Sequence, residues 1–182
     1  MIHNIPEPIK LLLSGTDRFV LAIDGRCGAG KTTLAGQIAQ TYNAFVVHLD
    51  DFFLPKGMQK SGHGNLEKER LLREVILPLS QGKEVCYRVF SCCEQRYTQT
   101  VTIPRGASVV VEGSYAMLDE FRFAYTHSVF LNVDGKEQRR RILKRNGEAA
   151  WRVFETRWIP EEEQYIEAQH PETVCDVCGC FP

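Results

Sequence analysis

The chain has 182 residues, of which 43% are hydrophobic and 25% are charged, and its net charge at pH 7 is −1. These values fit one folded domain with a core of its own, and the near-zero charge excludes a global field that would recruit nucleic acid or an anionic membrane. The seven cysteines lack the spacing of a secreted disulfide framework, so we expect reduced thiols and a cytoplasmic protein.

Short apolar runs rich in Val and Phe alternate with amphipathic runs along the chain. The first residues contain prolines and a glutamate where a signal peptide needs an uninterrupted apolar run, and their apolar part is too short to span a bilayer. Strands are expected at residues 19–23, 45–49, 108–111 and 128–133, with a weaker fifth candidate at 173–178. Helices are predicted over residues 31–41, 66–79, 135–145 and 148–168.

The boundaries of the last two helices have local signals. Asp134 is a candidate cap for the helix at 135–145, which is expected to stop near Asn146–Gly147, and Pro160 is expected to bend or split the last helix. Near-continuous apolar strands suit a parallel sheet that is covered on both faces. The alternation of strands and helices therefore predicts an α/β domain.

Residues 25–32 match the pattern G-x-x-x-x-G-K-[ST] in full, directly after a predicted strand and before a predicted helix. Glycines let successive main-chain N–H groups converge on one point, and a helix N-terminus there favours an anion. The alternative is an ordinary glycine-rich turn with a solvated lysine. The context favours a phosphate-binding loop, and its candidate nucleotide-binding residues are Gly25, Gly28, Ala29, Gly30, Lys31, Thr32 and Thr33.

This loop predicts that a nucleoside triphosphate binds together with Mg²⁺. Lys31 would supply a point charge for the β and γ phosphates, and the Thr32 hydroxyl would bind the metal ion. No Asn-Lys-x-Asp segment is present to select guanine, which disfavours a GTPase. ATP is the expected cofactor, although the sequence leaves the choice between ATP and GTP open.

Two predicted strands end in carboxylates, at the edge of the sheet where ligands bind in open parallel sheets. Asp50 could accept a hydroxyl proton and orient the oxygen for attack on the γ-phosphorus, and it is also assigned to the metal site. Its neighbour Asp51 points to the other side and is expected to cap the following turn. Glu112 has the arrangement of a carboxylate that holds Mg²⁺, and the alternative for it is a polar residue at the start of a loop.

Arg141 and Arg145 are four residues apart on a predicted helix and share one face. Their guanidinium groups suit phosphoryl oxygens, particularly while charge redistributes during phosphoryl transfer. The same pattern also fits a solvated basic helix face. The sequence leaves both interpretations open.

A further set of motifs carries a resemblance to a known family. They are I-D-G-R-C-G-A-G-K-T-T, L-D-D-F-F-L-P, G-N-L-E-K-E-R, E-V-I-L-P-L, V-V-V-E-G-S-Y, R-I-L-K-R-N-G-E and R-W-I-P, and they lie between residues 18 and 178. In this order they resemble the uridine kinase-like, or phosphoribulokinase/uridine kinase, group of P-loop kinases.

The resemblance implies a P-loop NTPase fold, three layers α/β/α with a five-stranded parallel sheet and a helical lid. It implies one kinase domain over residues 1–182, with the lid at about 135–160. It further implies that Asp50 is the base for the acceptor hydroxyl, that Glu112 helps to hold Mg²⁺, and that the two lid arginines contact phosphates.

The resemblance also implies residues that bind the acceptor. Glu67 falls where the family binds the sugar hydroxyls of a nucleoside, and Phe90 is positioned to stack on a base. Both depart from the family pattern, because related chains mostly carry aspartate at the first position and more aromatic residues around the second. Glu67 also fits the first turn of a helix, and Phe90 also fits the core.

The C-terminal region contains His170, Cys175, Cys178 and Cys180, which could in principle supply four zinc ligands. The spacing C-x-x-C-x-C is crowded for one tetrahedral centre, and the resemblance places residues 175–178 on the last strand. We therefore interpret these cysteines as small apolar residues.

These features predict an ATP- and Mg²⁺-dependent kinase that transfers the γ-phosphoryl group to a primary hydroxyl, with a nucleoside such as uridine or cytidine as the expected acceptor. One alternative is a nucleotide-binding switch with little transferase activity. Another is a kinase of a non-nucleoside hydroxyl compound, such as a sugar phosphate or a pantothenate-like acid. No nucleic-acid or membrane partner is expected, and homo-oligomerisation is left open.

Overall fold

The structure is a computed structural model that describes residues 5–55, 57–58 and 65–181. Its centre is a five-stranded parallel sheet with the strand order β2-β5-β1-β6-β7. The strands are β1 (Val20–Gly25), β2 (Phe45–His48), β5 (Val109–Glu112), β6 (His127–Leu131) and β7 (Val177–Gly179). The predicted α/β class and the five-stranded parallel sheet are therefore confirmed.

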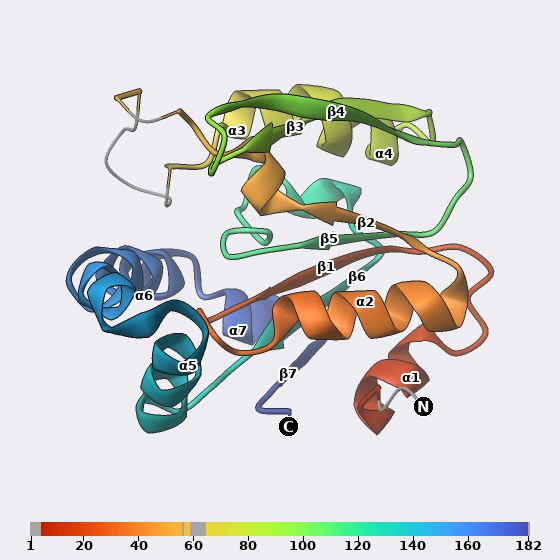
Figure 1. Cartoon of the computed structure of the whole chain (residues 1–182). Helices are drawn as coiled ribbons and strands as arrows, with labels where there is room; N and C mark the ends of the chain where they lie inside the picture. Colours follow the sequence, from red (N-terminus) through yellow and green to blue (C-terminus); the bar gives the residue numbers. More distant parts are fainter. Residues whose placement is uncertain (1–4, 56, 59–64, 182) are drawn as a thin grey trace.

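One face of the sheet is covered by α1 (Glu7–Leu13) and α2 (Lys31–Tyr42), as Figure 1 shows. Ile9 of α1 and Ile38 of α2 are fully buried and belong to one apolar cluster with Leu21 and Ile23 of β1. Burial of this kind stabilises the domain by roughly 1.5–3 kcal/mol for each large aliphatic side chain. This shared burial holds the start of α2 close to the end of β1.

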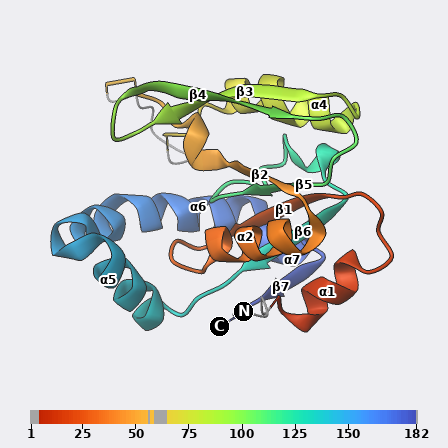
Figure 2. The same cartoon turned by 45° about the vertical axis from the view of Figure 1, so that its right-hand side comes forward.

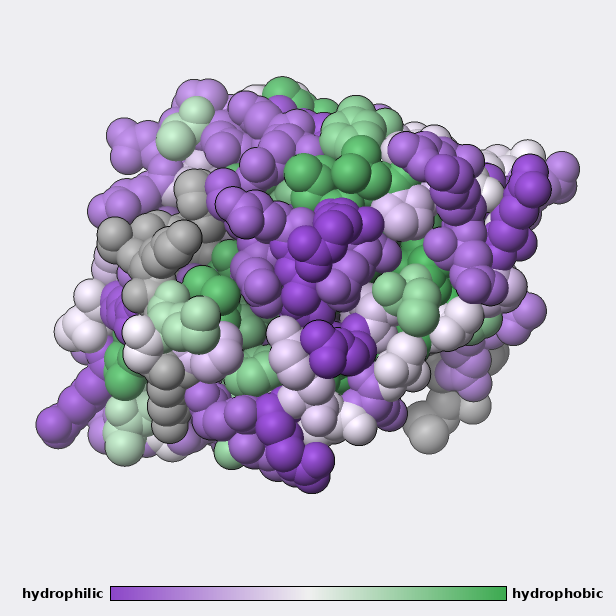
Figure 3. Space-filling view, turned by 90° about the horizontal axis from the view of Figure 1, so that it is seen from above, coloured by the Kyte–Doolittle hydropathy of each residue, from purple (hydrophilic) through white to green (hydrophobic). Residues whose placement is uncertain are grey.

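The opposite face is covered by a helical run, by a hairpin and by α6 (Ile159–Gln169). The run consists of α3 (Lys68–Leu71), a π-helical turn at Leu72–Ile76 and α4 (Leu77–Ser80), and it matches the helix predicted at 66–79. The antiparallel hairpin of β3 (Val85–Ser91) and β4 (Arg96–Ile103) is not anticipated by the sequence analysis. Figure 2 shows the hairpin stacked beyond β2, and its outer surface in Figure 3 is mainly hydrophilic.

The segment after β6, where the sequence analysis expects a lid, is helical. Helix α5 (Gly135–Val153) begins at Asp134, whose side chain accepts the N–H groups of Lys136 (2.8 Å) and Glu137 (3.2 Å). Its helical geometry is interrupted at Gly147, where φ is 80°, as the sequence predicts. A π-helical turn at Phe154–Trp158 then continues into α6 without leaving the right-handed helical region, so Pro160 follows a widened turn and does not end the helix.

One prediction for the C-terminal region needs correction. Residues 171–174 form a short helix, α7 (Pro171–Val174), and the last strand is β7, whereas a strand was expected at 173–178. The reason is that His170 adopts a left-handed conformation (φ 46°) and ends α6, so that Pro171 begins another helical turn.

Short 3₁₀ turns at Leu49–Phe52 and Arg122–Ala124 complete the described elements. No helix in the described ranges has both the length and the apolar composition that crossing a bilayer requires.

Candidate active site

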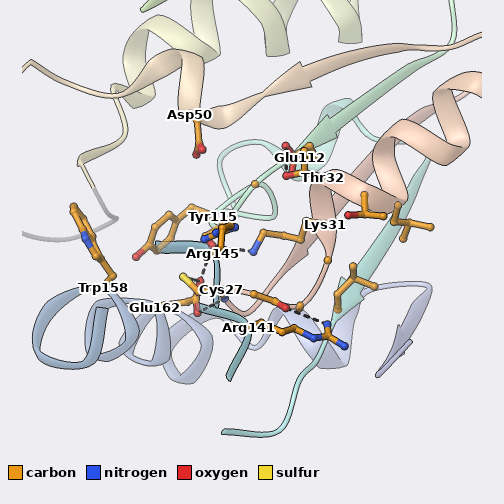
Figure 4. A pocket seen from close by; sticks show the side chains of 18 of the residues that line it. Cys27, Lys31, Thr32, Asp50, Glu112, Tyr115, Arg141, Arg145, Trp158 and Glu162 are labelled. Carbon is orange, nitrogen blue, oxygen red and sulfur yellow. Dashed lines mark hydrogen bonds between the residues drawn. The ribbon is translucent and has the colours of Figure 1, made fainter. Parts of the chain in front are cut away.

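The glycine-rich loop joins β1 to α2 and lines a cavity of about 780 Å³ (Figure 4). Gly25, Gly28 and Gly30 have positive φ values of 140°, 74° and 100°, a region that L side chains rarely adopt. At Gly25 a Cβ atom would lie 2.1 Å from the carbonyl oxygen of Leu131, so glycine is required there by close packing as well. The loop residues Ala29, Lys31, Thr32 and Thr33 line the same cavity.

Lys31 directs its ammonium group back into the loop. Its Nζ donates to the carbonyl oxygens of Gly25 (2.5 Å) and Arg26 (3.1 Å) and to the Ser114 hydroxyl (3.1 Å). An ammonium group has three N–H donors, so three acceptors satisfy it completely. A phosphate would therefore have to replace some of these contacts to bind Lys31.

Thr32, in the first turn of α2, meets Glu112 at the carboxyl end of β5. The Thr32 hydroxyl donates to Glu112 Oε1 at 3.1 Å, and Nδ1 of His48 lies 2.6 Å from the same oxygen. The hydrogen bond to Glu112 raises the pKa of His48. A hydroxyl and a buried carboxylate are hard oxygen donors of the kind that Mg²⁺ prefers, so this pair fits the metal ion.

Asp50 and Asp51 lie next to each other in a 3₁₀ turn, and their side chains point in different directions. Asp50 opens into the cavity, and its side chain points towards the space that the loop and Glu112 border (Figure 4). Burial by the surrounding walls raises the pKa of Asp50, and the negative charge of Glu112 adds to the rise. Asp51 points away, and it accepts the Tyr87 hydroxyl at 3.2 Å instead of capping the turn.

The two predicted lid arginines lie differently. Arg141 donates to Glu137 (2.6 Å) and to the carbonyl oxygen of Gly28 (3.1 Å), so it holds the glycine-rich loop from below. Arg145 lies closer to the centre of the cavity in Figure 4, and its positive charge acts to lower the pKa of Asp50. Of the two, Arg145 is therefore better placed to reach a group that sits beside Asp50.

The predicted acceptor residues Glu67 and Phe90 do not line this cavity. Glu67 accepts a hydrogen bond from Nε of Arg70 at 2.8 Å at the start of α3. Phe90 is 5% exposed and packs edge-on against Tyr97, with ring centres 5.6 Å apart. It borders a second, more open hollow beside Asp50 on the hairpin.

Known proteins resemble this chain in part of its sequence and in its fold. No protein-family model matches the chain. A uridine kinase from Saccharomyces cerevisiae is 30% identical over 119 aligned residues, which cover 57% of this chain and 24% of the yeast protein, so the chain spans about a quarter of that relative. A structure from Bacillus stearothermophilus, described as a possible uridine kinase, superposes with a TM-score of 0.73 at 22% identity and covers 93% of this chain and 94% of that one.

A second solved structure, a candidate fructose transport system kinase from a Silicibacter species, gives a TM-score of 0.75 at 20% identity and covers 100% of this chain and 99% of that one. The chain is therefore similar to a uridine kinase over part of that protein's sequence and shares its fold with two solved structures described as kinases. These two similarities show a shared fold. The descriptions of the two proteins name different phosphoryl acceptors.

One carboxylate at the glycine-rich loop was missed by the sequence analysis. Glu162 of α6 is 1% exposed and accepts the main-chain N–H of Cys27 (2.8 Å), the Cys27 thiol (3.2 Å) and the Ser114 hydroxyl (2.6 Å). Burial and the charge of Glu162 raise the pKa of Cys27 to about 12, so its thiol stays protonated. The sequence signal was the run of glutamates at 161–163, which reads as an ordinary solvated helix face.

A second missed group links the loop to α6 from the side. Arg26 forms two hydrogen bonds with the Glu163 carboxylate, at 2.7 and 2.8 Å, and a third with Asn132 at the end of β6. Gln138 of α5 donates to the Cys27 carbonyl at 3.1 Å. The glycine-rich loop is thus held by both helices of the lid region, which no local pattern indicates.

The C-terminal cysteines do not assemble with His170. Within the described ranges, no three His, Cys, Asp or Glu side chains are grouped so that they could hold a metal ion. Cys178 lies on β7, where its sulfur accepts the Asn132 amide at 3.4 Å, and Cys175 precedes the strand.

Proposed function

We propose that the chain is an ATP- and Mg²⁺-dependent kinase that transfers the γ-phosphoryl group to a primary hydroxyl, with a nucleoside such as uridine or cytidine as the leading acceptor. One observation carries the proposal: Asp50 opens into the same cavity as Lys31 and Thr32. A carboxylate in that position can accept the proton of a hydroxyl that attacks the terminal phosphorus. The kinship with uridine kinase-like proteins supports the same assignment.

The phosphates would lie on the glycine-rich loop at the N-terminus of α2, where main-chain N–H groups and the helix dipole favour an anion. Lys31 would exchange its contacts within the loop for phosphate oxygens. Thr32 and Glu112 would hold Mg²⁺, which neutralises phosphate charge when it is bound.

Asp50 takes the acceptor proton in this proposal. Its raised pKa suits that task, because a base with a pKa nearer to the operating pH accepts a proton more effectively. Arg145 would contact the transferring group, and Arg141 would support the loop from below. The proposal treats residues 1–182 as one P-loop kinase domain in which the region at about 135–160 closes over the reactants and excludes water.

The acceptor has one specific alternative. The likeness to a candidate fructose transport system kinase, with a TM-score of 0.75, favours a non-nucleoside hydroxyl compound as the second candidate. A nucleotide-dependent switch is the alternative to any kinase, and it would not need a base at Asp50.

The substitution Asp50→Asn separates a kinase from a switch. We expect the variant to bind ATP with wild-type affinity in calorimetry but to lose phosphoryl transfer to a panel of nucleosides and sugars by roughly 10²–10⁴-fold. Asp51→Asn is the matched control, because Asp51 points away from the main cavity and should retain transfer. Equal transfer rates for wild type and Asp50→Asn would refute the kinase proposal.

A further inference from the structure

The guanidinium group of Arg70 is buried beside the 3₁₀ turn that carries Asp50. Arg70 belongs to α3 and is 3% exposed, and its carbon Cζ lies 4.2 Å from the centre of the Phe52 ring at the end of that turn. Burying a charged group costs free energy unless the group is paired and hydrogen-bonded. The contacts that hold Arg70 in this position therefore indicate what it does.

Two hydrogen bonds of Arg70 end on main-chain carbonyl groups of separate segments. Its Nη2 donates to the carbonyl oxygen of Asp51 in the turn at 2.6 Å, and its Nη1 donates to the carbonyl oxygen of Arg88 in β3 at 2.9 Å. One rigid, planar group thus joins the turn to the hairpin β3–β4. The width of the guanidinium group sets the spacing between the two segments.

Two carboxylates from the same helical run orient this group. Nε of Arg70 donates to Glu67 Oε2 at 2.8 Å, and Nη1 lies 3.4 Å from Glu74 Oε2. Both carboxylates also compensate the buried positive charge. Glu67, for which the resemblance implies a contact with the acceptor, is in this structure a partner of Arg70.

A second side chain of the hairpin supports the same turn. The Tyr87 hydroxyl donates to Asp51 Oδ2 at 3.2 Å, and the ring centres of Tyr87 and Phe52 are 5.0 Å apart in the core. Asp51 is therefore held at its carbonyl group by Arg70 and at its carboxylate by Tyr87. Both contacts come from outside the turn.

The position of Asp50 depends on these contacts, because Asp50 and Asp51 share the backbone of one four-residue turn. A shift of the Asp51 carbonyl group would move the Asp50 side chain as well. Asp50 borders the main cavity (Figure 4) and also the hollow that is lined by the turn and the hairpin. A displacement of about 1 Å in a group that must face its reactant can lower a rate by roughly 10²-fold.

We infer that Arg70 is a positioning residue for phosphoryl transfer, because it holds the turn of Asp50 at a fixed distance from the hairpin. The inference rests on the proposed function, in which Asp50 accepts the proton of the acceptor hydroxyl. Arg70 is buried and lines neither the main cavity nor the hollow, so it acts through the carbonyl group of Asp51 and touches no reactant.

The substitution Arg70→Lys tests the inference. Lysine keeps the positive charge beside the two carboxylates, but its single nitrogen cannot join two carbonyl groups that the guanidinium group reaches with separate nitrogens. We expect kcat for transfer to the panel of nucleosides and sugars, expressed per ATP-binding site, to fall by roughly 10–10²-fold. The Kd for MgATP in calorimetry should stay unchanged.

Arg73→Lys is the matched control. Arg73 lies in the same helical run, its side chain is 71% exposed, and it contacts Glu74 at 3.3 Å. The same change of side chain at this position should leave both kcat and the Kd for MgATP at their wild-type values.

Calorimetry also counts the ATP-binding sites in each preparation, and this count separates positioning from folding. If Arg70 only stabilises the fold, Arg70→Lys lowers the number of sites per chain, and each remaining site keeps the wild-type kcat. That result would overturn the inference. A lower kcat per site at an unchanged number of sites and an unchanged Kd for MgATP supports it.

Tyr87→Phe keeps the test decisive if Arg70→Lys does not fold. It removes the hydroxyl that Asp51 accepts and retains the ring that packs on Phe52, so kcat per site should fall by about fivefold. Asp51→Asn keeps this hydrogen bond, because an amide oxygen also accepts a hydroxyl. Tyr97→Phe is the control on the same hairpin, since Tyr97 is 39% exposed, and it should retain the wild-type kcat.

The outcomes distinguish this inference from the proposed function. A wild-type kcat per site in Arg70→Lys, or in Tyr87→Phe where the first variant does not fold, would overturn the positioning role, and the kinase proposal would stand as long as Asp50→Asn loses transfer. If Asp50→Asn leaves phosphoryl transfer unchanged, the kinase proposal itself fails.

Discussion

Glu162 accepts the main-chain N–H of Cys27 at 2.8 Å, so a buried carboxylate of α6 contacts the glycine-rich loop directly. The same carboxylate accepts the hydroxyl of Ser114 at 2.6 Å, and Ser114 in turn accepts the ammonium group of Lys31 at 3.1 Å. The Ser114 hydroxyl therefore connects the Glu162 carboxylate to Lys31. This arrangement links the glycine-rich loop to α6 through one side chain.

Glu162→Gln should strengthen nucleotide binding. The substitution keeps the size of the side chain and removes a negative charge close to where phosphates would bind, a repulsion of roughly 1–2 kcal/mol at this range. We expect the Kd for MgATP in calorimetry to fall by about tenfold. Glu167→Gln, on an exposed position one turn further along α6, should leave the Kd unchanged. A weaker affinity for Glu162→Gln would show that the carboxylate supports the loop instead.

Thr32→Ala should weaken the response to magnesium. The Thr32 hydroxyl donates to Glu112 at 3.1 Å, and both oxygens belong to the proposed metal site. Removing it should raise the Mg²⁺ concentration for half-maximal phosphoryl transfer by about tenfold. Thr32→Ser retains the hydroxyl and should behave like wild type, so an equal defect in both variants would speak against a metal-binding role.

Asp24→Asn should destabilise the fold. Asp24 is 1% exposed, and its carboxylate accepts four hydrogen bonds from three main-chain N–H groups and the Tyr165 hydroxyl. An amide –NH₂ must face at least one N–H donor there, which leaves buried donors unsatisfied and costs roughly 1–3 kcal/mol. Urea denaturation followed by circular dichroism measures this loss.

Tyr165→Phe provides the comparison for Asp24. It removes one hydrogen bond of 2.7 Å to the carboxylate without placing a donor against a donor. Its cost should therefore be smaller, about 1 kcal/mol. An unfolding midpoint for Asp24→Asn equal to that of wild type would contradict the account of this buried carboxylate.

Two glycines should respond in opposite ways to alanine. At Gly25 the added Cβ would lie 2.1 Å from the Leu131 carbonyl oxygen, and φ is 140°, so Gly25→Ala should lower the unfolding free energy by roughly 3 kcal/mol or more or prevent folding. Gly36 lies in α2 with nothing within 4 Å of an added Cβ, so Gly36→Ala should raise stability by about 0.5–1 kcal/mol. Thermal unfolding of the two variants checks both signs.

Much of the fold follows from local patterns. The apolar runs at 19–23 and 108–111 predict strands that the structure contains as β1 and β5, and Asp134 caps α5 as expected. The hairpin β3–β4 is missed although β3 alternates between buried and exposed residues, because its partner β4 is largely exposed and shows little hydrophobic alternation. The strand expected at 173–178 is shifted because the left-handed turn at His170 allows a helical turn to form first.

The sequence by itself determined the α/β class, the glycine-rich loop and the carboxylates at the strand ends, because these depend on residue type at short, regular spacing. Only the tertiary structure decided that Glu162 lies against Cys27, that Arg141 supports the loop, and that Trp158 rather than Phe90 borders the main cavity. Each of these findings depends on a contact between residues that are distant in the chain, or on which of two similar side chains reaches the cavity. Helix packing sets them, and no local pattern encodes how α5 and α6 fold back onto the loop.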